Sequence, residues 1–232
     1  MNGVPDSLNV LAVDTATEAC SAALLSRGVV YQHFEIAPRR HHALIFEMCQ
    51  AAFEEAKMDI AELNALVYGR GPGSFTGVRI AASLVQGLAY GCNLPVVAVS
   101  DLQAVALQAL EQSDAAQVLV AMDARMGEVY YGYFEKDGDL VRAMTDESIA
   151  SPEKLVVPKT FKGIGAGTAM PLYRTALEQT LGTRLIKWYA PELPQANTLL
   201  RLALPQLAAD DTLSADQALP IYLRHPVNTK PV

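Results

Sequence analysis

The sequence of 232 residues lacks several features that mark common protein classes. No apolar run approaches the roughly 20 residues that a membrane-spanning helix needs, so we expect no membrane segment. The first seven residues are polar and turn-like, without the apolar centre of a signal peptide, which favours a cytoplasmic protein. Its three cysteines, Cys20, Cys49 and Cys92, are widely spaced in apolar sequence, as is typical of reduced core thiols.

Positive charge is also scarce. The chain has 18 Lys and Arg against 25 Asp and Glu, which gives a net charge of -7. A protein that holds a nucleic-acid backbone alone normally has a basic stripe, and the sequence shows none. The densest basic cluster, Arg39 to His42, is more typical of a solvated helix start. We therefore expect the isolated chain to bind nucleic acid weakly.

Familiar hydrolase motifs are missing as well. The sequence contains neither a G-x-S-x-G elbow nor an H-E-x-x-H helix. No two of its histidines, His33, His41, His42 and His225, are spaced three to five apart, so no pair is placed on one helical face as zinc binding requires. Zinc-dependent or covalent hydrolysis has no local support.

A glycine-rich loop organises the chain, in the string Y-G-R-G-P-G-S-F-T-G-V-R from Tyr68 to Arg79. The apolar run before it and the periodic segment after it predict a strand, a tight turn and a helix capped by Ser74 or Thr76. The Walker and dinucleotide patterns do not fit, because Gly77 is followed by Val78 instead of Lys. Two interpretations stay open: a compact packing turn, or an anion site at the helix N-terminus.

The helix predicted from Gly77 to Gly91 has an apolar arc that should face a sheet. Small residues recur every four positions on the other side of this helix. A glycine in the middle of a helix lowers its stability by about 0.5 to 1 kcal/mol relative to alanine. Close approach of another helix would recover this cost, whereas the alternative is a tolerant surface. We predict that this side meets a partner through Arg79, Ser83, Gln86, Gly87, Tyr90 and Gly91.

A second helix is predicted from Arg40 to Lys57. Its apolar residues sweep about half of the circumference, which is wider than the roughly 100° that one sheet needs. Either a neighbouring element of this chain covers the excess or a partner does. The candidate partner residues here are Leu44, Ile45, Met48 and Ala52.

The chain repeats one pattern twice. Strands Leu8–Val13, Ala19–Leu25 and Val29–Ile36 precede the two helices, and strands Val118–Met122, Glu128–Phe134 and Leu140–Thr145 begin a similar unit. Each first strand ends at an acid, Asp14 or Asp123. The repetition predicts a duplicated fold with subdomains 1–112 and 113–232. We expect Leu219–Leu223, with Arg224-His225-Pro226, to form an extended, loosely anchored tail.

Such a duplicated α/β unit resembles the ribonuclease H-like fold of actin, Hsp70 chaperones and sugar kinases, in which each of two subdomains has a mixed sheet and flanking helices. Four strings resemble the TsaB (YeaZ) family more closely: L-A-V-D-T-A-T-E-A-C-S-A-A-L-L from Leu11, G-R-G-P-G-S-F-T-G-V-R from Gly69, M-D-A-R-M-G-E-V-Y from Met122 and P-I-Y-L-R from Pro220. They are spread over nearly the whole chain.

The resemblance implies a noncatalytic scaffold for the machinery that installs threonylcarbamoyl on N6 of the adenosine 3′ of the anticodon (t6A), in tRNAs that read codons starting with A. It implies a heterodimer with the catalytic paralogue TsaD, joined by the ATPase TsaE, and a homodimer in isolation. The two helices 40–57 and 77–91 would form these interfaces. This chain would need no cofactor, with ATP, Mg²⁺ and metal on partner subunits, and tRNA would bind only through the complex.

A vestigial nucleotide or anion site is the remaining candidate, formed by Asp14, Thr15, Gly73, Ser74, Thr76 and Asp123. Kinase-like relatives tend to have glycine two residues after the first-strand acid, whereas this chain has Ala16, and Met126 lies in the second turn. We therefore expect no tight ATP binding. The alternative functions are an ATP-dependent kinase or ATPase of the same fold and a glycopeptidase of the M22 type, an older label for this family.

Overall fold

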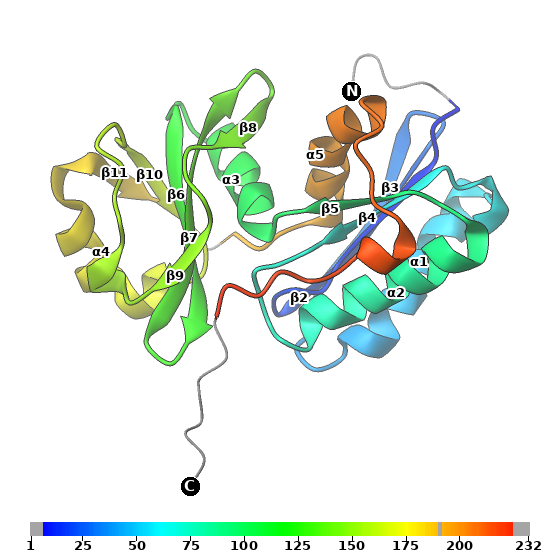
Figure 1. Cartoon of the computed structure of the whole chain (residues 1–232), viewed down its shortest axis with the longest axis horizontal. Helices are drawn as coiled ribbons and strands as arrows, with labels where there is room; N and C mark the ends of the chain where they lie inside the picture. The colour runs from blue at the N-terminus through cyan, green and yellow to red at the C-terminus, as the bar shows by residue number, and fades with distance from the viewer. Residues whose placement is uncertain (1–6, 190–191, 225–232) are drawn as a thin grey trace, which may run out of the picture.

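The computed structural model describes residues 7–189 and 192–224, which form two lobes, each built on a mixed β-sheet (Figure 1). The N-terminal sheet has the order β3-β2-β1-β4-β5 and the C-terminal sheet the order β11-β10-β6-β7-β8, with β9 paired to β7. Their strands are β1 (Val10–Asp14), β2 (Ala19–Ser26), β3 (Val29–Ile36), β4 (Ala65–Gly69), β5 (Val96–Val99), β6 (Gln117–Arg125), β7 (Glu128–Asp137), β8 (Leu140–Ala143), β9 (Ser148–Ala150), β10 (Gly163–Ala166) and β11 (Leu185–Trp188).

The two sheets have the same topology. In the first, β1 is antiparallel to β2 and parallel to β4. In the second, β6 is antiparallel to β7 and parallel to β10. Each lobe thus begins with a meander and continues with two parallel strands, which confirms the predicted duplication and fold class.

The helices lie in three layers around the sheets (Figure 1). Helices α1 (His41–Ala56) and α2 (Gly77–Cys92) cover the outer face of the N-terminal sheet, and α4 (Met170–Leu181) covers the outer face of the C-terminal sheet. Helices α3 (Asp101–Glu111) and α5 (Ala196–Ala208) lie between the sheets. Strand β1 is therefore covered on both faces, and all five of its residues are buried.

The two inner helices are exchanged between the halves of the chain. Helix α3, from the first half, packs on β6, β7 and β8, whereas α5, from the second half, packs on β1, β2, β4 and β5. The sheets lie on either side of residue 112, but each lobe is completed by a helix from the other side of that position. The lobes therefore share one continuous apolar core.

Several local expectations differ from the structure. Residues Pro152–Lys154 form a single 3₁₀ turn, and β9 was not expected. Thr76 occupies the N-cap of α2 without a side-chain hydrogen bond, while Ser74 Oγ accepts one from the Gly77 amide at 3.4 Å. Cys20 and Cys49 are buried thiols as expected, but Cys92 is exposed at the end of α2.

Residues 213–224, which we call the strap, run from the N-terminal lobe to the C-terminal lobe. The Ile221 amide donates to the Arg70 carbonyl at 2.8 Å, and the Tyr68 hydroxyl donates to the Leu219 carbonyl at 3.0 Å. Arg224 forms an ion pair with Glu128 at 2.8 Å. The expectation of a loosely anchored tail is wrong for Leu219 to Arg224, while the expected continuation through His225 and Pro226 lies outside the described residues. Within the described ranges, no helix combines the length and the apolar character that a membrane crossing requires.

Candidate functional site

The glycine-rich loop lies against the turn between β1 and β2. The Ser74 amide donates to the Ala16 carbonyl at 2.7 Å. A side chain at Gly73 would overlap that carbonyl, and one at Gly77 would overlap the carbonyl of Thr15. The glycines therefore allow two backbone segments to touch, which supports the packing interpretation of this loop.

Two residues of the expected nucleotide site are fully buried and do not line a cleft. The Thr15 hydroxyl donates to the Gly77 carbonyl at 2.7 Å and accepts from the Ala81 amide at 3.1 Å, so it ties the β1–β2 turn to the start of α2. Asp14 accepts from the Ala16 amide at 3.0 Å and is 0% exposed. The placement of Asp14 and Thr15 in an accessible site is thus corrected, because packing already uses both side chains.

Asp123 repeats the geometry of Asp14 in the second lobe. Its carboxylate accepts from the Arg125 amide at 2.9 Å, the same two-residue turn that Asp14 makes with Ala16. Asp123 also forms an ion pair with Arg125 at 3.2 Å. The two acids are structural counterparts in turns, and Asp123 faces the space between the lobes while Asp14 does not.

An open cleft of about 1370 Å³ separates the lobes beside these turns. Gly73, Ser74, Thr76 and Asp123 of the expected site line it. Its basic lining residues are Arg39, His41, His42, Arg79, Arg125 and Arg224, and its acidic ones are Glu18 and Asp123. The cleft is therefore richer in positive than negative groups, although the whole chain carries a net charge of -7.

A group of buried acids lies where the lobes meet. Burial raises the pKa of Asp101 well above its ordinary value, and the adjacent Asp14 carboxyl raises it further. Asp101 also accepts from the Gly71 amide at 2.5 Å. Burial raises the pKa of Asp14 as well. Sequence reasoning missed this pairing, because an acid at the first position of a helix is ordinary.

Glu147 links the lobes beside this pair. It comes from the C-terminal lobe, accepts a hydrogen bond from Ser100 Oγ and forms an ion pair with Arg70 at 3.3 Å, both on the N-terminal lobe. Burial raises the pKa of Glu147, whereas the Arg70 guanidinium opposes that effect. No motif in the sequence marks Glu147 or Arg70 as partners.

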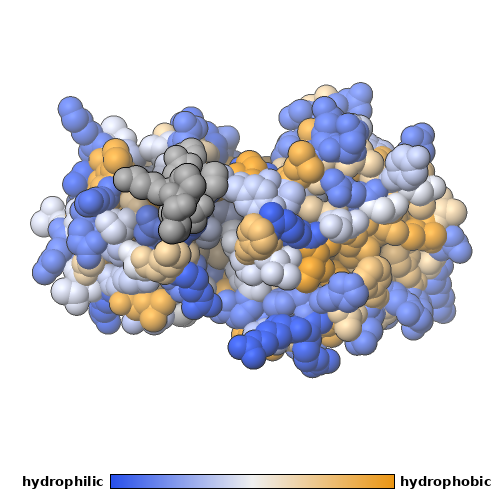
Figure 2. All heavy atoms as spheres, turned by 60° about the horizontal axis from the view of Figure 1, so that its bottom comes forward, coloured by the Kyte–Doolittle hydropathy of each residue, from blue (hydrophilic) through white to orange (hydrophobic). Residues whose placement is uncertain are grey.

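The outer face of α1 and α2 is the surface that we predicted to meet a partner. Figure 2 shows hydrophobic residues gathered on the right-hand lobe, where these helices come forward. A groove of about 600 Å³ lies between the helices, with Phe46, Phe53, Leu84 and Leu88 in its lining. We call this surface the helical face.

On α2, the predicted residues lie outside the core. Ser83, Gly87, Tyr90 and Gly91 are exposed, whereas Arg79 and Gln86 are half-buried. No atom lies within 4 Å of a side-chain carbon built at Gly87 or Gly91. The chain itself therefore offers no packing reason for these two glycines.

On α1, the predicted partner residues are corrected. Leu44, Ile45, Met48 and Ala52 are buried in the core of the N-terminal lobe, with exposures of 6%, 0%, 7% and 0%. The sheet and α2 together cover the wide apolar arc, which was the alternative interpretation. The large apolar residues of α1 that remain accessible are Phe46, which is 53% exposed, and the half-buried Phe53.

The buried thiols are poorly suited to nucleophilic chemistry. Burial raises the pKa of both Cys20 and Cys49 to about 12, which keeps them protonated at neutral pH. In residues 7–189 and 192–224, no serine or cysteine donates to a histidine ring, and no three His, Cys, Asp or Glu side chains gather as metal ligands do. His225 lies outside those ranges.

The sequence and the structure were compared with known proteins. Residues 27–220 match the family model described as TsaD: tRNA N6-adenosine threonylcarbamoyltransferase. The tRNA threonylcarbamoyladenosine biosynthesis protein TsaB of Escherichia coli strain K12 is 37% identical, over 96% of this chain and 97% of the relative. The protein of the same name from Bacillus subtilis strain 168 is 27% identical, over 94% of each.

A solved structure described as YeaZ from Pseudomonas aeruginosa matches the fold closely. Its TM-score is 0.86 at 40% sequence identity, and the match covers 93% of this chain and all of that one. A second structure, described as an uncharacterized protein with similarity to peptidase YEAZ from the same organism, also has a TM-score of 0.86.

Proposed function

The chain belongs to the TsaB (YeaZ) family of tRNA threonylcarbamoyladenosine biosynthesis proteins, and from this premise we propose that it is a noncatalytic subunit that binds and stabilises the catalytic paralogue TsaD. TsaE joins the complex, and tRNA is held through the partners. The protein works in the cytoplasm, and the isolated chain forms a homodimer through the surface that TsaD takes over. ATP, Mg²⁺ and the catalytic metal belong to the partner subunits.

The observation that carries this proposal is the helical face. Its apolar groove between α1 and α2 is open to solvent, and contiguous exposed apolar surface of this kind marks protein interaction sites. Tyr90 is 87% exposed and Phe46 is 53% exposed, which is costly for rings that meet only water. A TsaD helix packed in the groove would bury Phe46, and one packed on the exposed side of α2 would bury Tyr90.

Small residues explain how a helix can pack on the exposed side of α2. Gly87 and Gly91 have no neighbour within 4 Å of a built side-chain carbon, so a partner backbone can approach α2 closely. Ser83 continues the same line one turn earlier. The axes of two packed helices come as close as about 8 Å only where small residues lie at the contact.

Size-exclusion chromatography with light scattering tests the proposal, using the full chain alone, TsaD alone and their mixture. We expect a heterodimer to form at the expense of the homodimer, and only the mixture with TsaE to modify tRNA. If no complex forms and the lone chain hydrolyses ATP, the scaffold function is wrong and an ATPase of the same fold replaces it. A stoichiometric metal in elemental analysis of the lone chain would instead favour a peptidase.

A further inference from the structure

The strap is held on the N-terminal lobe by backbone hydrogen bonds near both of its ends. At its start, Leu213 exchanges two of them with Val96 of β5, at 2.7 and 2.9 Å. Further along, the Ile221 amide donates to the Arg70 carbonyl at 2.8 Å. The strap therefore follows any movement of this lobe.

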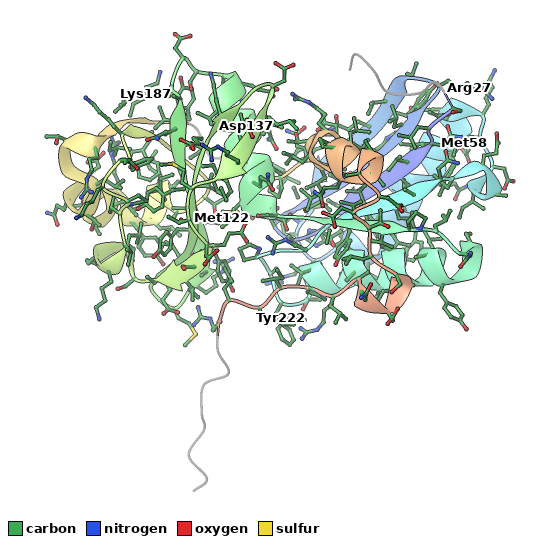
Figure 3. The ribbon with its side chains drawn as sticks, turned by 45° about the horizontal axis from the view of Figure 1, so that its top comes forward. Arg27, Met58, Met122, Asp137, Lys187 and Tyr222 are labelled. Atoms are coloured by element: carbon green, nitrogen blue, oxygen red, sulfur yellow. The ribbon has the colours of Figure 1, made fainter. Side chains whose placement is uncertain are left out.

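A side chain of α2 adds a contact just beyond Ile221. The Arg79 guanidinium carbon lies 3.3 Å from the centroid of the Phe75 ring and 4.9 Å from that of Tyr222, which belongs to the strap. Arg79 also donates to the Phe75 carbonyl at 2.9 Å, which fixes the guanidinium at the start of α2. Figure 3 shows Tyr222 on the strap, where it passes from one lobe to the other. Cation–π attraction extends the attachment to the N-terminal lobe as far as Tyr222.

A single residue attaches the strap to the C-terminal lobe. Arg224 forms an ion pair with Glu128 at 2.8 Å and donates to the Ala124 carbonyl at 2.9 Å, where β6 turns into β7. Among the described residues, no other part of the strap forms a hydrogen bond or an ion pair with that lobe. The Arg224 and Glu128 side chains are 29% and 35% exposed, so water and salt reach this ion pair. It can therefore open while the core stays folded.

The stretch between the two attachments is too short to lengthen. Only Leu223 lies between Tyr222 and Arg224, and two residue steps span at most about 7 Å. The strap crosses the cleft of about 1370 Å³, which Ile221, Tyr222 and Arg224 help to line. Figure 1 shows the strap in red, below α3 and α5, whose packing joins the two lobes in one core. A widening of the cleft would pivot about these helices and pull the strap from one of its attachments.

We propose that the strap is a tether that sets the width of the cleft, and that Arg224 is its releasable attachment. While Arg224 is bound, the two lobes keep one spacing without any ligand or partner. When Arg224 is released, the C-terminal lobe moves away and the core around α3 and α5 stays packed. This inference goes beyond the scaffold function, because it concerns the lone chain and does not depend on TsaD.

Double electron–electron resonance between spin labels on the two lobes tests the tether. The labels are attached at Ala208→Cys on α5, which packs on the N-terminal sheet, and at Gln179→Cys on α4, in a Cys92→Ser parent that lacks the exposed native thiol. Dilution with unlabelled wild type restricts the signal to distances within one chain. We expect a narrow distribution in this parent. Arg224→Ala should give a broader distribution with a longer mean, because the strap no longer holds the C-terminal lobe.

Hydrogen exchange of residues 213–224, measured by mass spectrometry, gives an independent readout. In Arg224→Ala, the amides of this segment should exchange about fivefold faster, whereas β1 in the core should keep its wild-type protection. Unchanged exchange in 213–224 would contradict the tether. If β1 loses protection to the same extent, Arg224 stabilises the whole fold and the tether is wrong.

Matched variants identify the cause of any change in distance. Arg224→Lys keeps a positive charge for Glu128 and should give a distribution between those of the parent and Arg224→Ala. Arg142→Ala removes an exposed ion pair with Glu135 elsewhere on the C-terminal lobe and should match the parent. The proposal is overturned if Arg224→Ala keeps the parent distances, if the parent distribution is already broad, or if Arg142→Ala broadens it equally. TsaD is absent from all these measurements, so a failure of the scaffold function would be a separate result.

Discussion

Asp14 and Asp101 bring their carboxyl groups together in the interior, above a glycine that leaves room for both. Each side chain is 0% exposed, and one oxygen of each, Asp14 Oδ2 and Asp101 Oδ1, has no other hydrogen-bond partner among the described residues. A methyl group at Gly69 would overlap both of these oxygens. Two carboxyl groups in such a place are stable only if they share a proton, because two adjacent buried negative charges repel.

This pair should make stability depend on pH. Burial raises the folded-state pKa of both acids above the ordinary value of 3.8, so above about pH 4 the folded chain binds more protons than the unfolded chain. The free energy of unfolding therefore falls as pH rises from there through the folded pKa values. In Asp101→Asn, an amide can still accept from Gly71 and can donate to Asp14. We expect this variant to melt at a higher temperature at pH 8, by about 2 to 4 °C for each kcal/mol gained.

Differential scanning fluorimetry of the wild type and Asp101→Asn at pH 5 and pH 8 measures this effect. The drop in melting temperature from pH 5 to pH 8 should be smaller in Asp101→Asn than in the wild type. The exposed Asp139→Asn serves as the control and should follow the wild type. If Asp101→Asn shows the full wild-type drop, the pair does not hold an extra proton in the folded state. Glu147, whose pKa burial also raises, accounts for the drop that remains.

The same pair makes Gly69 sensitive to substitution. Gly69→Ala would force a methyl group into both carboxyl groups, and such overpacking costs about 1 to 3 kcal/mol. Gly87→Ala is the matched control, because its methyl meets open space on a helix and should stabilise the monomer by about 0.5 to 1 kcal/mol. Urea unfolding of both variants measures the difference. A neutral Gly69→Ala would mean that the carboxyl groups can move apart.

Local periodicity predicted most of the fold. Strands β1 to β3 and helices α1 and α2 begin and end within two residues of their expected bounds, because their apolar patterns are long and their turns are marked. The segment around Pro152 and strand β9 are too short for a pattern to show. The exchange of α3 and α5 could not be predicted, since both inner helices are apolar enough to suit either sheet.

The candidate site was predictable only where the signal is local. The glycines of α2 lie four residues apart in sequence, so their shared exposed side follows from helix geometry alone. On α1, the same reasoning gave a wide apolar arc but could not tell that the sheet and α2 cover Ile45 and Ala52. Asp101 is buried against Asp14 and Gly69, which are distant from it in sequence. A local sequence pattern cannot predict a contact between such distant residues.

Glu147 should be important for holding the lobes together. It is 11% exposed and satisfies both Arg70 and Ser100, so Glu147→Ala would leave the half-buried guanidinium unpaired and cost about 3 kcal/mol or more. Glu147→Gln should cost less, because the amide oxygen can still accept from Ser100. The exposed pair of Arg142 and Glu135 gives a control, since Arg142→Ala should cost at most about 1 kcal/mol.

Chemical denaturation of Arg70→Ala, Glu147→Ala and the double variant measures this link. We expect the double variant to lose less stability than the sum of the single ones, because the second substitution removes a group that the first has already left unpaired. Strict additivity would show that the two side chains act independently across the lobe boundary.

The helical face gives the sharpest test of the scaffold function. Gly87→Arg places a long charged side chain where no atom of this chain lies within 4 Å, so the monomer should fold with an unchanged circular dichroism spectrum. Its melting temperature should be no lower than that of the wild type, because arginine favours a helix more than glycine does. A TsaD helix packed against α2 would clash with that side chain, and burying an unpaired charge at an interface costs several kcal/mol, so heterodimer formation should weaken by a hundredfold or more. Gln179→Arg adds the same charge to an exposed position of α4, on the other lobe, and should bind TsaD normally. Light scattering of each mixture measures heterodimer formation. If Gly87→Arg binds TsaD as the wild type does, α2 is not part of the interface. If both variants lose the same amount of binding, the added charge, and not the helical face, is the cause.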